Sequence, residues 1–187
     1  MSTIRFKAEL FNIGSSTLLS LPAGASAKLP SRGMTMVKGT INGFPFQAAL
    51  EPDGMGSHWL RVNRTLRQAA GAKAGDTVTL AIEPSAEWPE PEVPADAKEA
   101  LTTDPQVRDL WMDITPLARW DWIRWINAAR QPETRRRRIE NVCSMLKTGK
   151  RRPCCFNRNL CTDPYVSKNG VLLEPKETIV KKRGPKR

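Results

Sequence analysis

Histidine is almost absent from this chain of 187 residues, since His58 is the only one. A Ser-His-Asp triad or a Cys-His pair would have to use it, because both need an imidazole as general base. The chain also lacks a glycine-rich phosphate loop and a paired-histidine metal motif. His58 alternates with Leu60 and Val62, which predicts a buried, hydrogen-bonded histidine on a strand. No catalytic residue is therefore assigned.

Long apolar runs are missing as well. No stretch of about 18 apolar residues occurs, so no membrane-spanning helix is predicted. Arg5 and Lys7 lie where a signal peptide would need its apolar core. We therefore expect a cytoplasmic protein without membrane contact.

Cysteine is confined to the last quarter of the chain, at Cys143, Cys154, Cys155 and Cys161. This crowding argues against a disulfide framework spread through a secreted fold, so we expect reduced thiols. Cys154, Cys155 and Cys161 follow a proline in a predicted loop, where they could bind zinc or act as redox-active thiols. Zinc sites usually pair cysteines at C-x-x-C spacing, which is absent here. Ordinary thiols are the alternative.

Positive charge dominates the composition, with a formal net charge of +11 at pH 7, but it is unevenly placed. Residues 1–83 carry nine basic and five acidic side chains, whereas residues 84–129 carry four and nine. Residues 130–152 carry nine basic and two acidic side chains, and residues 176–187 carry six and one. The positive excess is thus concentrated in two C-terminal blocks.

Short strands are predicted in the first 83 residues. Apolar and polar side chains alternate in three segments, 3–13, 57–62 and 78–82. Asn42-Gly43 separates two more strands, 34–41 and 44–50. Because this dipeptide accepts positive φ at both positions, it predicts a type I′ hairpin. The buried face of that hairpin is expected to carry Phe44, Phe46, Ala48 and Leu50.

Two short helices complete this part of the chain. Pro22 suits the first position of one, and Asn63 is a favourable N-cap for the other, which Gly71 would end. Five or six short strands with two short helices favour a small β-barrel over a parallel sheet.

The pattern changes after residue 83. Residues 84–93 contain three prolines and three glutamates, which predicts a stiff acidic linker that packs against nothing. Four helices are predicted beyond it, at 94–101, 105–112, 116–129 and 132–146, each opened by a proline. Apolar faces at helical spacing comprise Ala118, Trp122, Trp125, Ile126 and Ala129 in the third helix, and Ile139, Val142, Cys143 and Leu146 in the fourth. We expect these faces to pack as a small bundle, although a tryptophan stripe could instead stack on bases or sugars.

Two resemblances follow from these segments. The order Leu21-Pro22, Thr40-Ile41-Asn42-Gly43, Gly75-Asp76 resembles a double-split β-barrel domain of unknown function found in many small bacterial proteins. Residues 93–153 resemble the YdeI/OmpD-associated, or bacteriocin-protection, family through Val93-Pro94-Ala95-Asp96, Trp125-Ile126-Asn127-Ala128-Ala129, Glu133-Thr134-Arg135 and Met145-Leu146. The second resemblance implies a stress or protection role and supplies no catalytic residues.

Four consecutive arginines, Arg135 to Arg138, lie in the first turns of the fourth predicted helix. Cations there oppose the helix dipole by about 0.3–1 kcal/mol each, so something should compensate them. Arg135 and Arg138 are expected at the edge of the buried face. One interpretation pairs them with carboxylates of residues 84–129, such as Asp109, Asp113 or Asp121, as a structural charge network.

The other interpretation makes this region an anion site. It assigns the phosphate groups of a nucleic acid or of a small ligand to Arg136, Arg137, Lys150, Arg151 and Arg152. Both interpretations hold together if the inner pair is structural and the outer residues are exposed. The basic tail, residues 176–187, resembles minor-groove AT-hook tails but lacks their central Arg-Gly-Arg-Pro. It is either a solvated tail or a nonspecific nucleic-acid contact.

The sequence therefore predicts an α+β chain of two domains. A double-split β-barrel (1–83) is followed by an acidic linker (84–93), a small all-helical domain (94–153), and a cysteine-containing loop with a basic tail (154–187). The predicted function is a non-enzymatic, stress-related module that binds nucleic acid or another polyanion. The alternatives are a thiol-based or zinc-dependent activity at Cys154, Cys155 and Cys161, and an interaction module that forms a homodimer through its barrel.

Overall fold

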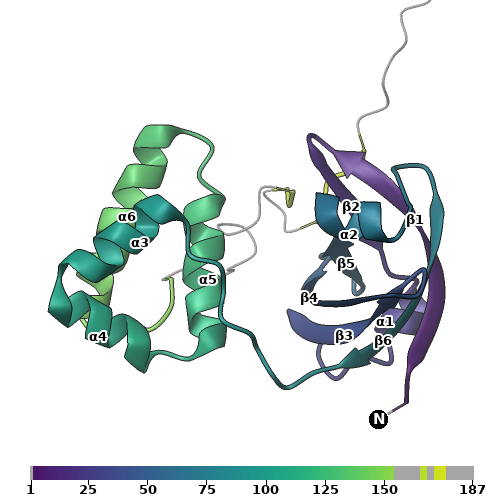
Figure 1. Ribbon diagram of the computed structural model, residues 1–187, viewed down its shortest axis with the longest axis horizontal. Coiled ribbons are helices and arrows are strands. Elements are labelled where there is room, and N and C mark those ends of the chain that lie inside the picture. Colours follow the sequence, from purple (N-terminus) through teal and green to yellow (C-terminus); the bar gives the residue numbers. More distant parts are fainter. Residues whose placement is uncertain (1, 154–164, 168–170, 176–187) are drawn as a thin grey trace, which may run out of the picture.

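Antiparallel strands dominate the N-terminal part of the chain (Figure 1). The computed structural model describes residues 2–153, 165–167 and 171–175. Its strands are β1 (Ile4–Ile13), β2 (Ser16–Ser20), β3 (Thr35–Ile41), β4 (Phe44–Pro52), β5 (His58–Arg61) and β6 (Thr77–Pro84). They close in the order β1-β2-β5-β4-β3-β6, which confirms the predicted barrel.

The two longest strands are each shared between two neighbours. β1 pairs with β6 through residues 4–9 and with β2 through residues 10–13. β4 pairs with β3 through residues 44–50 and with β5 only at residues 51–52. Two short helices, α1 (Ala23–Ser26) and α2 (Arg64–Ala69), contact these long strands. The predicted cap of α2 is confirmed, because Asn63 Oδ1 accepts a hydrogen bond of 2.8 Å from the Leu66 amide.

The predicted hairpin is present between β3 and β4. Asn42 and Gly43 have φ values of 48° and 88°, as a turn with positive φ at both positions requires. The predicted burial of its face is wrong at the turn, because Phe44 is 46% exposed whereas Leu50 is fully buried. Near the turn β4 has a neighbouring strand on one side only, so less of the barrel covers it.

His58 is a buried and fully hydrogen-bonded histidine, as predicted. Its Nε2 donates to the Gly33 carbonyl at 2.9 Å, because a carbonyl can only accept. Its Nδ1 therefore accepts from the Ser26 hydroxyl at 2.7 Å. Burial lowers the pKa of His58 below its ordinary value of 6.5, and the nearby Arg32 acts in the same direction. The folded state thus favours the neutral ring.

This burial predicts a loss of stability in mild acid. Below about pH 6.5 the unfolded chain binds a proton at His58 that the folded chain does not, so the free energy of unfolding falls as pH falls, by up to about 1.4 kcal/mol per pH unit. Asp96 and Asp104 also have lowered pKa values, but their contribution is lost only below about pH 4. Urea unfolding at pH 7.5 and 5.5 should therefore show a drop that His58→Gln reduces. An equal drop in the free energy of unfolding of the unaltered protein and of His58→Gln would show that other groups cause the loss of stability.

Four helices form the second part of the chain. They are α3 (Ala95–Thr103), α4 (Pro105–Asp113), α5 (Pro116–Asn127) and α6 (Pro132–Lys147), which confirms the predicted helical region. Prolines occupy the first turns of the last three. Asp104 Oδ1 accepts from the Gln106 amide at 2.9 Å and Thr115 Oγ1 from the Ala118 amide at 3.3 Å, so side chains cap α4 and α5. In the described part of the chain, no helix is long and apolar enough to span a membrane.

The apolar faces of α5 and α6 pack on each other and on α3 and α4. Trp122 and Ile126 of α5 are fully buried, and Val142 and Leu146 of α6 are nearly so. The rings of Trp122 and Trp125 meet edge to face with centroids 5.9 Å apart. The tryptophan stripe at helical spacing is therefore part of the bundle core.

The prediction that residues 84–93 pack against nothing is wrong. Trp120 of α5 donates from Nε1 to the Pro89 carbonyl at 2.7 Å, and its ring meets that of Trp88 edge to face at 6.4 Å. Arg119 Nη2 lies 2.6 Å from Glu90 Oε1. Figure 1 shows the segment passing α5 on its way from β6 to α3. Trp120 thus supplies a side-chain donor to a backbone carbonyl of this proline-rich segment.

The described residues near the C-terminus lie against the barrel. Tyr165 packs edge to face on Trp59 at 5.9 Å, and its hydroxyl is hydrogen-bonded to Ser16. The Arg61 guanidinium lies over the Tyr165 ring, 4.8 Å from its centroid. The Leu172 amide donates to the Asp53 carbonyl at 2.9 Å. The chain therefore returns from α6 to β2 and β5.

Candidate functional site

Arg135 is held by a carboxylate across the bundle. Its Nε and Nη2 lie 2.6 Å and 2.9 Å from the two carboxylate oxygens of Asp96, and its Nη1 donates to Asn127 Oδ1 at 3.0 Å. This two-point hydrogen bond lowers the pKa of Asp96 and raises that of Arg135. Asp96 lies in the acidic segment 84–129, as expected, but it is not one of the three carboxylates that the sequence singled out.

Arg138 lies against the C-terminal end of α5. It donates to the Trp125 carbonyl and places its guanidinium 5.0 Å from the centroid of the Trp125 ring. Burial lowers the pKa of Arg138, and the neighbouring charge of Arg137 adds to this effect. Both contacts are favourable, because the indole face attracts a cation and the C-terminal end of a helix carries partial negative charge.

The three carboxylates that the sequence singled out as examples lie within ion-pair distance of other residues. Asp109 pairs with Arg108. Asp113 Oδ2 lies 2.8 Å from Arg151 Nη1, and Asp121 Oδ2 lies 3.5 Å from Arg152 Nη1. Two residues predicted to bind anions therefore already contact carboxylates.

The chain direction after α6 explains these contacts. Gly149 has a φ of 79°, which ends the helix in the left-handed region that glycine favours. The following residues turn back toward α4 and α5, where Trp122 Nε1 donates to the Arg151 carbonyl at 3.2 Å. Periodicity cannot show such a contact, because it depends on how the chain leaves the helix.

The predicted anion-binding residues nevertheless remain accessible to solvent. Arg136 is 70% exposed, and among the described residues its ion-pair partner is Glu133 of the same helix, at 2.9 Å. Arg151 is 59% exposed despite its contact with Asp113, and Arg152 is half-buried. Arg137 and Lys150 are exposed, and in the described part of the chain neither has an ion-pair partner.

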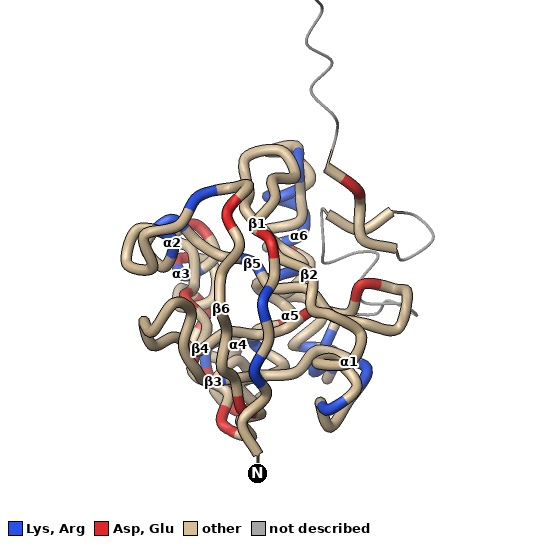
Figure 2. The backbone as a smooth tube through the Cα atoms, turned by 90° about the vertical axis from the view of Figure 1, so that its right-hand side faces the viewer, with Lys and Arg blue, Asp and Glu red and all other residues tan. Residues whose placement is uncertain are grey.

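These cations are not gathered into one pocket. Arg136 and Arg137 lie in the second turn of α6, whereas Lys150, Arg151 and Arg152 follow its last residue. Ten helical residues rise about 15 Å, so the two groups lie at opposite ends of the helix. Figure 2 shows basic positions spread over both parts of the molecule, with acidic positions among them.

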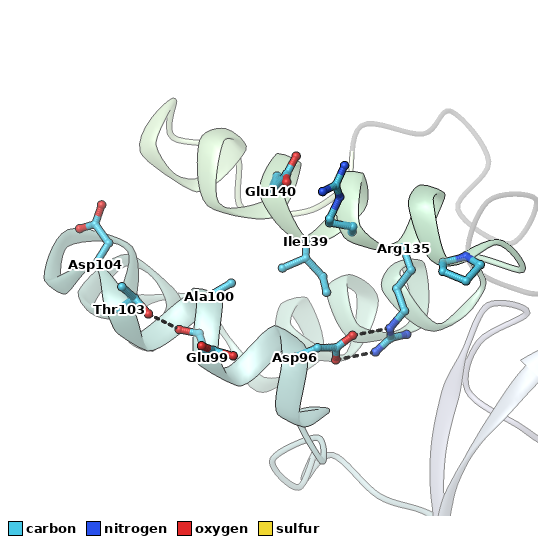
Figure 3. Close-up of a pocket in the computed structure, with 10 residues that line it drawn as sticks. Asp96, Glu99, Ala100, Thr103, Asp104, Arg135, Ile139 and Glu140 are labelled. Carbon is cyan, nitrogen blue, oxygen red and sulfur yellow. Dashed lines mark hydrogen bonds and ion pairs between the residues drawn. The ribbon is translucent and has the colours of Figure 1, made fainter.

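A groove lies between α3 and α6, with a volume of about 640 Å³. Figure 3 shows its walls, with Asp96, Glu99 and Asp104 on the α3 side and Arg135 and Glu140 on α6. Apolar groups of Ala100, Pro132 and Ile139 contribute the rest of its surface, together with Thr103 and Arg136. Sequence analysis did not predict this groove, because it forms only when the two helices lie side by side.

Ion pairs between charged side chains join the barrel to the bundle. The sequence analysis did not predict them. Arg124 Nη2 of α5 lies 2.6 Å from Glu51 Oε2 of β4, and both side chains are only 12% exposed. Arg124 Nη1 also lies 3.6 Å from Asp121 Oδ1, and the Asp121 side chain is 2% exposed. The signal available in the sequence was the pair of charges, Asp121 and Arg124, within a tryptophan-rich helix.

The predicted thiol cluster, Cys154, Cys155 and Cys161, lies outside the described residues. Cys143 is half-buried on α6, with its Sγ 3.7 Å from the Ala100 carbonyl, and burial raises its pKa. A thiol with a raised pKa is mostly protonated at neutral pH and is a poor nucleophile. Within the part of the chain that the structure describes, no group of three or more His, Cys, Asp or Glu side chains could hold a metal ion.

Two families match separate segments of the chain. The family described as "Domain of unknown function (DUF1905)" matches residues 6–82, which span the barrel. The family described as "Bacteriocin-protection, YdeI or OmpD-Associated" matches residues 90–149, which span α3 to α6. A search of curated proteins found no match. The N-terminal barrel is therefore a DUF1905 domain, and the helical region belongs to the bacteriocin-protection, YdeI or OmpD-associated family.

Proposed function

We propose that the protein is a non-enzymatic module that binds an extended polyanion such as nucleic acid. The contacts would be the exposed cations of residues 136–152 together with the basic tail. The observation that supports this proposal is that Arg137 and Lys150 are exposed without an ion-pair partner in the described part of the chain. Such cations can neutralise phosphates without first breaking an internal contact.

The spacing of the cations favours a long ligand over a small one. Lys150 follows the end of α6, and the helix rises about 15 Å between Arg137 and its last residue, Lys147. A single phosphate could contact both groups only if the two side chains extended toward each other along the helix, whereas double-stranded DNA carries a charge about every 1.7 Å along its axis and can contact each of them separately. The ion pairs of Arg136 and Arg151 are exposed, and such pairs contribute at most about 1 kcal/mol, so a phosphate can compete for these side chains. The protection role named in the family description would be exerted through this binding.

The proposal predicts a salt-dependent affinity that two neutralising substitutions weaken. Arg137→Ala/Lys150→Ala should lower the affinity for a fluorescein-labelled 20-base-pair DNA by at least about tenfold at 50 mM salt. It should also make the slope of log K against log salt concentration shallower by about 1.8, because each lost phosphate contact removes about 0.9. The melting temperature should not change, since neither side chain has a described partner. Fluorescence anisotropy and thermal unfolding provide the two measurements.

Arg135→Ala is the matched control on the same helix. It removes one positive charge but breaks the contact with Asp96, so it should lower the melting temperature. Its affinity should fall less than that of the double variant. Affinity that is unchanged between 50 and 200 mM salt would rule out polyanion binding, and an unchanged affinity of the double variant would remove α6 from the site.

A further inference from the structure

Ion pairs join the two helices at both ends of the groove between α3 and α6. Arg135 and Asp96 join the two helices at one end. At the other end Lys147 Nζ lies 2.5 Å from Asp104 Oδ2. These two ion pairs link α3 to α6. Each of the four charges is compensated by its partner, so none of them is left to attract a ligand.

Two carboxylates between these ends differ from the others. Glu99 on α3 and Glu140 on α6 line the groove, and in the described part of the chain neither has an ion-pair partner. Glu140 attracts the Arg136 guanidinium one turn earlier on α6 without forming an ion pair with it. Figure 3 shows them on the two helices with Ala100 and Ile139 between them. The middle of the groove therefore combines two exposed carboxylates with an apolar surface, to which Ile139 of the helical core contributes a side chain that is 8% exposed.

The local charge is opposite to that of the whole chain. The chain has a formal net charge of +11, yet four of the ten groove residues are acidic and two are basic. Both of these arginines already contact a carboxylate, Arg135 that of Asp96 and Arg136 that of Glu133. A ligand that complements the groove must therefore place cations beside Glu99 and Glu140 and an apolar group between them, which is the opposite of a nucleic acid.

We propose that the α3–α6 groove binds a basic amphipathic segment of a partner protein, about two helical turns long. Between Asp96 and Asp104, α3 rises about 12 Å, which sets this length. The segment would place an apolar side chain on Ala100 and Ile139 and a Lys or Arg beside each of Glu99 and Glu140. Grooves between helices commonly bind an amphipathic helix in this way. This site goes beyond the proposed polyanion function and uses ligands of opposite charge.

A synthetic peptide tests the proposal on the full chain. The probe is a fluorescein-labelled ten-residue peptide with leucines on one helical face and lysines on the other. Glu99→Gln/Glu140→Gln should weaken its binding about tenfold, because two charge contacts are lost. The matched control is Glu9→Gln/Asp109→Asn, which makes the same change in net charge at exposed carboxylates outside the groove and should bind like the unaltered protein. Equal weakening in both variants would show nonspecific attraction and overturn the proposal.

Two further measurements locate the probe. The methyl resonance of Ile139 should shift on titration, since this side chain lines the groove, and an unshifted resonance would place the probe elsewhere. A peptide with the same lysines and with serine in place of leucine should bind at least about fivefold more weakly. Equal affinity of the two peptides would exclude the apolar contact and overturn the proposal.

The same variants separate this site from the polyanion site. Arg137→Ala/Lys150→Ala should leave peptide affinity unchanged, and Glu99→Gln/Glu140→Gln should not weaken binding of DNA. Either proposal can then fail alone.

If Lys181→Ala/Lys182→Ala/Arg183→Ala increases peptide affinity more than about threefold, the basic tail of the chain itself competes for the groove. That result would overturn the proposal that a partner protein is its occupant.

Discussion

Glu51→Ala should lower the free energy of unfolding by about 3 kcal/mol, which corresponds to roughly 10 °C in melting temperature. Glu51 lies 2.6 Å from Arg124, and both side chains are almost completely buried between the barrel and α5. Removing one partner of a buried pair leaves the other charge with less compensation, and that cost exceeds the loss of the contact itself. Asp121, 3.6 Å from Arg124, keeps the effect from being larger. Urea unfolding followed by circular dichroism measures it.

A double-mutant cycle identifies the pair as the cause. Arg124→Met removes the charge and keeps an apolar stem, so Glu51→Ala/Arg124→Met should lose less stability than the two single variants together, by roughly 1 kcal/mol or more. Glu133→Ala is the matched control, because it removes a carboxylate from the exposed pair with Arg136 and should change stability by at most about 0.5 kcal/mol. Strictly additive effects would mean that Glu51 and Arg124 act independently.

Trp122→Ala should destabilise the bundle by about 3–5 kcal/mol, the usual cost of truncating a fully buried tryptophan. The ring fills the centre of the helical core and meets Trp125 edge to face. The indole Nε1 also donates to the Arg151 carbonyl, so its loss should loosen the chain that follows α6. Thermal unfolding measures the first effect, and amide hydrogen exchange at residues 150–152 measures the second.

Trp122→Phe is the informative companion, because it keeps most of the apolar volume and loses the hydrogen bond. It should destabilise by less than half as much as the alanine variant, with similar loosening of residues 150–152. A tryptophan that served chiefly to stack on bases or sugars would instead tolerate alanine. Stability of Trp122→Ala within about 0.5 kcal/mol of the unaltered protein would contradict its place in the core.

Much of the fold could be predicted because its signals are local. Asn42-Gly43 imposes a tight turn on any two strands that flank it, and Asn63 caps a helix with its own side chain. The prolines that open α4, α5 and α6 act through the φ angle of a single residue. His58 was assigned correctly for a similar reason, since alternation along a strand decides which side chains face inward.

The site was predicted less well, because ion pairs depend on distances across the fold. The sequence places Arg135 on the edge of a buried face. Its partner Asp96 lies 39 residues away on α3, and the sequences of α3 and α6 do not reveal the angle at which the two helices pack. The same holds for Arg151 with Asp113 and for Trp120 with the Pro89 carbonyl. The composition of residues 84–93 predicts a linker without contacts. Polarity alone does not reveal that a neighbouring helix will contact the backbone of this segment.

The sequence by itself determined the elements, the two families and the presence of a positive excess near the C-terminus, since these depend on propensity, spacing and composition. Only the tertiary structure decided which charged side chains form ion pairs. It pairs Arg135, Arg151 and Arg152 with carboxylates, leaves Arg137 and Lys150 exposed, and creates an acidic groove in a basic chain. The physical reason is that charge interactions act over a few ångströms between elements, and only packing brings those elements within that range.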